Sequence, residues 1–382
     1  MAFGIVCEYN PFHNGHLHQI SEIKKVSDEP IICVMSGNFT QRGEVAIADK
    51  YERAEMALSA GADLVLELPI PYSIASAEYF ARAGVHVLAG ARVDKLSFGS
   101  ECADAGKIRK VATVACSPEF KAECESLPAN EGSASAYFAL LAEKSGENNI
   151  ISNDILGIEY TKAIIKNGYD MQIFPIKREG SAYRETKLSA GEHPSASAIR
   201  EALVDSNFKA IESFVPRATL EILKESEYSS LNYAKDGILL ALRLVDAEKL
   251  DVAVSDRGLV NRILSTAHEC TSFDEFEERL QTKKYTKSAI RRAILYILLG
   301  IKQSDIESLP EYTVLLGANE RGREYLSSIR KSEGAIKIIT KPSSIEACRQ
   351  SELSKKADAL YTMCFANKKE SGAYVKKSPV II

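Results

Sequence analysis

Short apolar runs alternate with stretches of helical periodicity along the first hundred residues. Apolar runs at residues 3–7, 30–35, 62–68 and 93–98 predict strands, and amphipathic stretches at 16–26, 51–60 and 75–88 predict the helices between them. Continuous apolar strands separated by helices are typical of a parallel sheet that is covered on both faces. We therefore predict a Rossmann-like, doubly wound α/β domain, with its ligands beyond the carboxyl ends of the strands.

The pattern changes in the second half of the chain. A late strand is predicted at 169–175 and a short helix at 197–202. Apolar residues then recur at helical spacing, at 211–223, 231–244, 257–267, 273–281 and 288–299. We expect an α/β domain over 1–205 and a mainly helical domain over 206–382. The apolar tail at 375–382 has no functional interpretation at this stage.

Length, charge and cysteine content exclude several classes of protein. A chain of 382 residues exceeds what one core usually organises, which agrees with two domains. The net charge of -4 means that any nucleic-acid contact must come from a local patch. The eight cysteines form no Cys-x-x-Cys pair, so we expect reduced thiols and no structural zinc. A signal peptide and a membrane-length apolar run are both missing, which predicts a cytoplasmic protein.

The most specific local feature is His13-Asn14-Gly15-His16, placed between the first predicted strand and the first predicted helix. Backbone amides at a helix N-terminus bind anions, and Gly15 allows close approach of a phosphate. Two imidazoles can donate hydrogen bonds where negative charge develops as pyrophosphate leaves. The alternative is a pair of surface histidines near a loop, but three of the six histidines fall within residues 13–18.

This motif resembles the His-x-Gly-His signature of the nucleotidyltransferase superfamily, which includes the class I aminoacyl-tRNA synthetases. Families of that kind carry a second phosphate element, and Ser195-Ala196-Ser197-Ala198-Ile199-Arg200 is similar to it. The serines would bond phosphate oxygens, and Arg200 would supply a fixed charge. Taken alone, the same residues also suit an ordinary helix N-cap.

A closer resemblance is to the bacterial tRNA(Met) cytidine acetate ligases, through four motifs in order. These motifs span residues 4–17, 36–43, 61–69 and 152–160. The resemblance implies that acetate and ATP form acetyl-adenylate with release of pyrophosphate. It also implies acetyl transfer to N4 of the wobble cytidine, C34, of elongator tRNA(Met), which gives N4-acetylcytidine.

The resemblance also implies that 1–205 is a nucleotidyltransferase-like, ATP-binding catalytic domain and that the helical domain over 206–382 binds tRNA. It further implies the residues of the site. His13, His16, Ser197 and Arg200 would be catalytic. ATP would contact Cys7, Glu8, Tyr9, Asn10, Pro11, Phe12, His13, Asn14, Gly15, His16, Leu17, His18, Gln19, Ile20, Gly99, Asn153, Arg178 and Glu179. Gly99 would leave room for the nucleotide and Arg178 would neutralise phosphate, although a plain turn and a solvated charge are the alternatives. Mg²⁺ is expected to bridge the phosphates, with Asp154 and Glu8 as outer partners and no dedicated metal cage. The polar loop at 36–43 would hold the acyl group or the cytidine, unless it is an ordinary connection.

A basic stretch near residue 290 indicates an RNA-binding surface. It contains no acidic residue, has tyrosines interleaved, and presents Lys283, Lys284, Tyr285, Lys287, Arg291 and Arg292. Phosphate attraction and base stacking suit such a surface, although charge runs are often only solvated faces. Two alternatives remain open on the sequence: a small-molecule adenylyltransferase without an RNA substrate, and a non-catalytic RNA-binding protein on the same scaffold.

Overall fold

A single twisted sheet forms the centre of the molecule. The computed structural model describes residues 1–126, 133–147, 154–178, 196–282 and 284–382. Within these ranges the strand order is β5-β4-β1-β2-β3-β6-β7, with β8 beside β6. The strands are β1 (Phe3–Cys7), β2 (Ile31–Ser36), β3 (Leu64–Leu68), β4 (Lys95–Ser100), β5 (Gln172–Lys177), β6 (Tyr312–Ala318), β7 (Lys337–Ile339) and β8 (Val380–Ile381).

The first five strands are parallel and confirm the predicted doubly wound α/β fold. β1 pairs with β2 on one side and with β4 on the other, so the strand order reverses at β1. Successive side chains point to opposite faces: Ile5 and Cys7 pack into one core, and Val6 packs into the other. A reversal of this kind opens a crevice at the carboxyl ends of the strands, where ligands bind.

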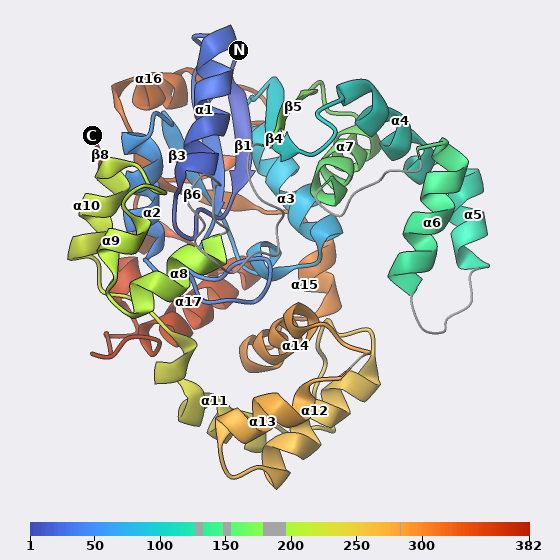
Figure 1. The fold of residues 1–382 in the computed structure, drawn as a ribbon, viewed down its shortest axis with the longest axis vertical. Coiled ribbons are helices and arrows are strands. Elements are labelled where there is room, and N and C mark those ends of the chain that lie inside the picture. Colours follow the sequence, from blue (N-terminus) through green and yellow to red (C-terminus); the bar gives the residue numbers. More distant parts are fainter. Residues whose placement is uncertain (127–132, 148–153, 179–195, 283) are drawn as a thin grey trace.

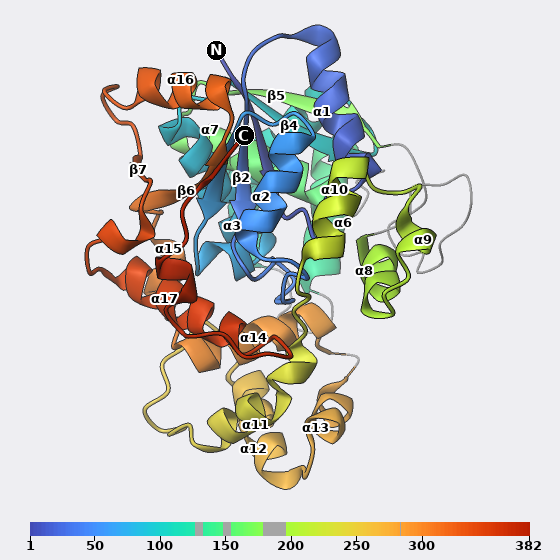
Figure 2. The same ribbon diagram turned by 90° about the vertical axis from the view of Figure 1, so that its left-hand side faces the viewer.

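Helices cover both faces of the sheet (Figures 1 and 2). One core receives α1 (Asn14–Val26), α2 (Lys50–Ser59), α8 (Ala196–Val204), α9 (Phe208–Ile211), α10 (Arg217–Glu225) and α17 (Arg349–Thr362). The opposite core receives α3 (Ala77–Gly90), α4 (Ala105–Cys116), α7 (Ile155–Asn167) and α16 (Glu320–Ile329). The helices α5 (Pro118–Glu125) and α6 (Ser133–Ser145) stand out beside α4 in Figure 1.

A third apolar core lies below the sheet, inside a group of helices (Figure 1). Its helices are α11 (Lys235–Arg243), α12 (Arg257–Glu269), α13 (Phe273–Leu280) and α14 (Lys287–Leu299), and α15 (Gln303–Glu307) leads back to the sheet. The helix expected at 211–223 is divided into α9 and α10, because Pro216 cannot donate a backbone hydrogen bond inside a helix. In the described residues, no helix has the length and apolar character needed to cross a membrane.

The end of the chain returns to the first sheet. β6 pairs antiparallel with β3, from Leu64↔Ala318 onward. β8, in the apolar tail, pairs with β6 through Gly317↔Val380, which gives that tail a structural role. The predicted domain boundary between residues 205 and 206 stays a proposal. Three strands of the sheet come after this boundary in the chain. Non-local pairing of this kind leaves little signal in a local sequence pattern.

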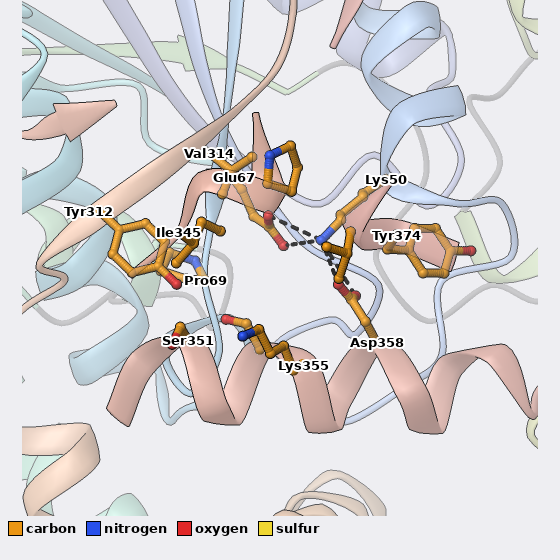
Figure 3. A pocket seen from close by; sticks show the side chains of 13 residues that line it. Lys50, Glu67, Pro69, Tyr312, Val314, Ile345, Ser351, Lys355, Asp358 and Tyr374 are labelled. Atoms are coloured by element: carbon orange, nitrogen blue, oxygen red, sulfur yellow. Dashed lines mark hydrogen bonds and ion pairs between the residues drawn. The ribbon is translucent and has the colours of Figure 1, made fainter. Parts of the chain in front are cut away.

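A buried ion cluster ties this returning segment to the first half of the chain (Figure 3). The Lys50 ammonium lies 2.9 Å from Glu67 and 3.1 Å from Asp358 of α17. Asn38 joins the cluster, since its amide donates to Asp358 and its oxygen accepts from the Lys50 backbone. Burial opposes the charge of Lys50, but the two carboxylates raise its pKa above the ordinary value. The cluster thus links α2, β3 and α17 through one ammonium group.

Lys50→Met should destabilise the fold strongly, because it leaves two carboxylates without their cation in a buried place. The expected loss is about 3–5 kcal/mol of the free energy of unfolding, measured by urea titration. Lys355→Met is the matched control, because Lys355 lines the small pocket beside this cluster but is itself exposed. This substitution should cost less than about 0.5 kcal/mol. Equal losses in the two variants would show that the ion cluster adds no more to the free energy of unfolding than an exposed lysine does.

Candidate nucleotide site

The turn between β1 and α1 is held in place by a buried arginine. Arg53 of α2 is 0% exposed and is surrounded by backbone oxygens in place of a carboxylate. Its guanidinium donates to the carbonyls of Glu8, Ser36, Gly37 and Ala48. Because Glu8 follows β1 and Ser36 ends β2, these bonds join the carboxyl ends of two neighbouring strands. The edge on which ligands are expected is therefore rigid at this point.

The two imidazoles cap helix α1 and stack on each other. Nδ1 of His13 accepts from the Gly15 backbone at 3.0 Å, and Nδ1 of His16 accepts from the His13 backbone at 3.2 Å. A neutral imidazole that accepts at Nδ1 carries its hydrogen on Nε2. The ring centroids are 3.8 Å apart. Both rings are thus oriented as Nε2–H donors, and a side chain at Gly15 would come within 2.9 Å of the His13 ring.

His16 is kept neutral by its surroundings. Desolvation lowers its pKa well below the ordinary value, and the nearby His13 and Arg178 lower it further. Tyr9 packs against its ring at 4.7 Å between centroids and Phe12 at 5.4 Å. A neutral donor of fixed orientation can stabilise a developing oxyanion without having to titrate near pH 7.

The second predicted phosphate element, at Ser197 and Arg200, lies at the same cavity as the two histidines. A cavity of about 360 Å³ has His13, His16, Ser197 and Arg200 in its wall. Arg200 donates to the Asn10 carbonyl at 2.8 Å and to the Ser197 hydroxyl at 3.2 Å. The volume falls in the range of small-molecule sites. Side chains almost two hundred positions apart in the sequence therefore face one space.

Glu44 connects this cavity to the helical region. Its carboxylate lies 2.9 Å from Arg200 with one oxygen and 2.7 Å from Arg291 of α14 with the other. One negative charge is shared between two arginines, so the three groups together keep a net positive charge. The neighbouring Gly43 lies directly against the α14 backbone, where a Cβ would come 2.9 Å from the Arg292 nitrogen. The 36–43 loop therefore packs between the cavity and α14.

The predicted ATP segment divides into lining and supporting residues. Phe12 and Ile20 are buried in the core, and Leu17 packs against it. Asn14 is turned away, since its amide donates to the Ser213 carbonyl at 2.9 Å. Pro11 is also absent from the described lining of the cavity. The residues of this segment that line the cavity are Cys7, Glu8, Tyr9, Asn10, His13, Gly15, His16, His18 and Gln19.

The opposite wall comes from the later strands. Gly99 and Arg178 both line the cavity, and a Cβ on Gly99 would meet the Arg178 side chain at 2.9 Å. Asn153, Glu179 and Ser195 lie outside the described residues. The sequence pattern gave no sign of an apolar part of this wall. Those of its residues that belong to α7 do lie within the 152–160 motif. The apolar residues of this wall are Phe80, Phe98, Leu156, Tyr160 and Ile176.

The basic stretch near residue 290 does not form one open face. Arg291 pairs with Glu44, and Arg292 contacts the Gln41 carbonyl while burial lowers its pKa. Lys284 and Tyr285 both bond to Asp256, whose pKa falls to about 2 because of these hydrogen bonds. Lys287 is exposed, and Lys283 lies outside the described residues. The acidic partners come from distant parts of the chain, so the local sequence did not show them.

The described residues offer no group of three or more His, Cys, Asp or Glu side chains arranged to hold a metal ion. Asp154, expected as an outer partner of Mg²⁺, accepts from the Ser100 hydroxyl at 2.6 Å and from the Glu101 backbone at 2.9 Å. It thus supports the end of β4 and does not line the cavity.

The lowered pKa of His16 predicts a specific pH dependence of stability. Below the unfolded-state pKa of about 6.5 the unfolded chain binds the extra proton first, so His16 makes the fold less stable as pH falls. His16→Asn removes this titration. The difference in unfolding free energy between wild type and variant should therefore shrink as pH is lowered from 7 to 5, in paired urea titrations. A difference that stays constant would mean that His16 titrates normally.

Comparison with known proteins agrees with this geometry. The model of a family described as HIGH Nucleotidyl Transferase matches residues 1–375. A protein named tRNA(Met) cytidine acetate ligase from Caldanaerobacter subterraneus subsp. tengcongensis is 38% identical, over 96% of this chain and 96% of that protein. Its namesake from Acetivibrio thermocellus is 36% identical, over 96% of this chain and 95% of that protein.

Solved structures show the same fold over the full length. Apo Thermotoga maritima TmcAL matches with a TM-score of 0.90 at 30% identity and covers 100% of both chains. TmcAL bound with alpha-thio ATP matches with a TM-score of 0.88 at 29% identity and covers 100% of this chain and 99% of that chain. By its sequence along almost its entire length, the chain belongs to the HIGH nucleotidyltransferase family and, within it, to the family of the tRNA(Met) cytidine acetate ligases.

Proposed function

We propose that this chain is a cytoplasmic, ATP-dependent ligase that activates acetate as acetyl-adenylate and acetylates N4 of C34 in elongator tRNA(Met). The observation that carries the proposal is the meeting of His13, His16, Ser197 and Arg200 at one cavity. The names of the relatives, and the ATP analogue held by the TmcAL structure, support the same activity.

The first step needs no protein nucleophile. A carboxylate oxygen of acetate attacks the α-phosphorus of ATP, the bond between that phosphorus and its bridging oxygen breaks, and pyrophosphate leaves. In this step the two Nε2–H groups and the Arg200 charge would face the phosphate oxygens on which negative charge develops. One such preorganised donor contributes roughly 3–4 kcal/mol to lowering the barrier.

The expected Mg²⁺ would be carried by the phosphates of ATP, since the described residues provide no protein cage for it. Bridging the phosphate oxygens would offset their negative charge. Loss of exchange activity on chelation, with recovery on adding Mg²⁺, is the direct test of this part of the proposal.

His16→Ala should lower acetate-dependent exchange of pyrophosphate into ATP by about 10²–10³-fold, because it removes one oriented donor. The matched control is His86→Ala, a histidine of α3 bonded to Tyr169, which should keep exchange within about twofold. Thermal melting checks that both variants fold. Near-normal exchange by His16→Ala would refute the assignment.

The same assay separates the alternatives. Exchange that requires acetate supports the ligase. Exchange that requires a different small molecule supports an adenylyltransferase, and a wild-type chain that binds RNA without any exchange supports a non-catalytic binder.

The RNA contact is best tested at exposed lysines. Arg291 and Arg292 contact the 36–43 loop and Glu44, so changing them would also disturb the cavity. Lys284→Glu combined with Lys287→Glu should weaken binding of tRNA(Met) about tenfold or more and reduce its dependence on salt, while ATP affinity is kept. Filter binding over a range of salt concentrations measures both effects. Unchanged affinity and salt slope would show that these lysines are only solvated charges; Lys121→Glu on exposed α5 is the control for surface charge.

A further inference from the structure

The second half of the proposed reaction, on which this inference rests, releases a proton. The N4 lone pair of cytidine attacks the acetyl carbon, the bond from that carbon to the AMP oxygen breaks, and AMP leaves with the bonding electrons. The nitrogen must then lose one hydrogen to become an amide. Because the N4 lone pair is delocalised into the ring, the amine is a weak nucleophile and gains from a base that takes its proton during attack.

The imidazoles of the cavity are poorly placed for this task. His13 and His16 both accept backbone hydrogen bonds at Nδ1, so their Nε2 atoms already carry a hydrogen. In this state Nε2 can donate to a ligand but cannot take a proton from it, and Nδ1 is already occupied by a backbone N–H. The capping geometry that makes them phosphate donors therefore removes them as bases.

Among the residues that the structure describes, three glutamates line the cavity: Glu8, Glu44 and Glu101. Glu44 has one carboxylate oxygen on Arg200 and the other on Arg291, so both of its oxygens already have a partner. Glu44 therefore offers a ligand no carboxylate oxygen that is still unpaired. Glu101 lies beside the Lys177 ammonium, which donates to its backbone oxygen.

Glu8 differs from the other two. One of its oxygens, Oε1, accepts from the Gln41 backbone at 2.6 Å, which fixes the carboxylate at the cavity wall. Arg53 holds the Glu8 main chain through its carbonyl. In the described part of the chain, no hydrogen bond reaches the second oxygen, Oε2. One oxygen is thus anchored and the other is available to a ligand.

Electrostatics agree with this geometry. Burial raises the pKa of Glu8, and the Gln41 hydrogen bond opposes the rise. Among the charged groups around Glu8, Glu44 raises the pKa and Arg200 and Arg42 lower it. The buried Arg53 guanidinium also interacts electrostatically with Glu8. A carboxylate with a raised pKa is a stronger base, and proton transfer by a positioned base contributes about 10²–10⁴-fold to a rate.

We propose that Glu8 is the general base of acetyl transfer, with its second oxygen taking the proton from N4 of the target cytidine as the carbon–nitrogen bond forms. The anchored oxygen keeps the Gln41 bond throughout. Glu8 then returns the proton to solvent after AMP departs.

The test isolates transfer from activation. Full-length wild type and Glu8→Gln receive synthetic acetyl-adenylate, without ATP or acetate, together with transcribed tRNA(Met), and single-turnover formation of N4-acetylcytidine is followed by mass spectrometry. Glu8→Gln keeps the size and polarity of the side chain but cannot take a proton. Transfer should fall about 10²–10⁴-fold, and at least thirtyfold more than acetate-dependent exchange falls in the same variant.

Two further readouts exclude a merely structural role. The wild-type transfer rate should rise with pH to a plateau, and Glu8→Gln should lose that rise. Glu8→Asp should recover part of the rate. Glu101→Gln, from the same cavity wall, should change transfer and exchange in the same proportion.

The idea is overturned if Glu8→Gln transfers acetyl at close to the wild-type rate, or if transfer and exchange fall by the same factor. The second result would make Glu8 an ATP-positioning residue. Failure of the proposed function looks different, because wild type itself would then form no N4-acetylcytidine from acetyl-adenylate.

Discussion

One buried guanidinium, that of Arg53, holds together the strand ends on which the candidate site is built. Within the part of the chain that the structure describes, it forms no ion pair with a carboxylate and instead donates to four backbone carbonyls, from the ends of β1 and β2 and from the segment before α2. A buried charge is tolerated only when its donors are paired, so the surrounding backbone cannot easily move. The position of Glu8, and of the turn that carries the imidazoles, follows from this constraint.

The imidazole pair shows how local structure can prepare a group for chemistry. His13 and His16 take part in a helix cap, and the same hydrogen bonds determine which ring nitrogen carries the hydrogen. Capping stabilises the first turn of α1 and orients two donors, and in the proposed mechanism it thereby serves both folding and function. The neutral state of His16, favoured by desolvation, makes that donor insensitive to small changes near neutral pH.

Glu44 gives the two halves of the molecule a common contact. Its carboxylate joins Arg200 of the cavity to Arg291 of α14, and the buried Lys50 cluster joins the same loop region to α17. The helical region is therefore attached to the nucleotide cavity through charged side chains as well as through apolar packing. A change of charge at α14 has a direct physical route to Arg200.

The sequence by itself determined the parallel strands, their covering helices and the turn with the two histidines, because each of these depends on local periodicity or on residues close together in the chain. It also indicated Ser197 and Arg200, through resemblance to a known motif. Tertiary structure alone decided that β6 and β8 complete the sheet and that Glu44 pairs with Arg200 and Arg291. It also decided that Asn14 turns away from the cavity. These features rest on contacts between residues far apart in the chain, which local hydrophobic patterns do not encode.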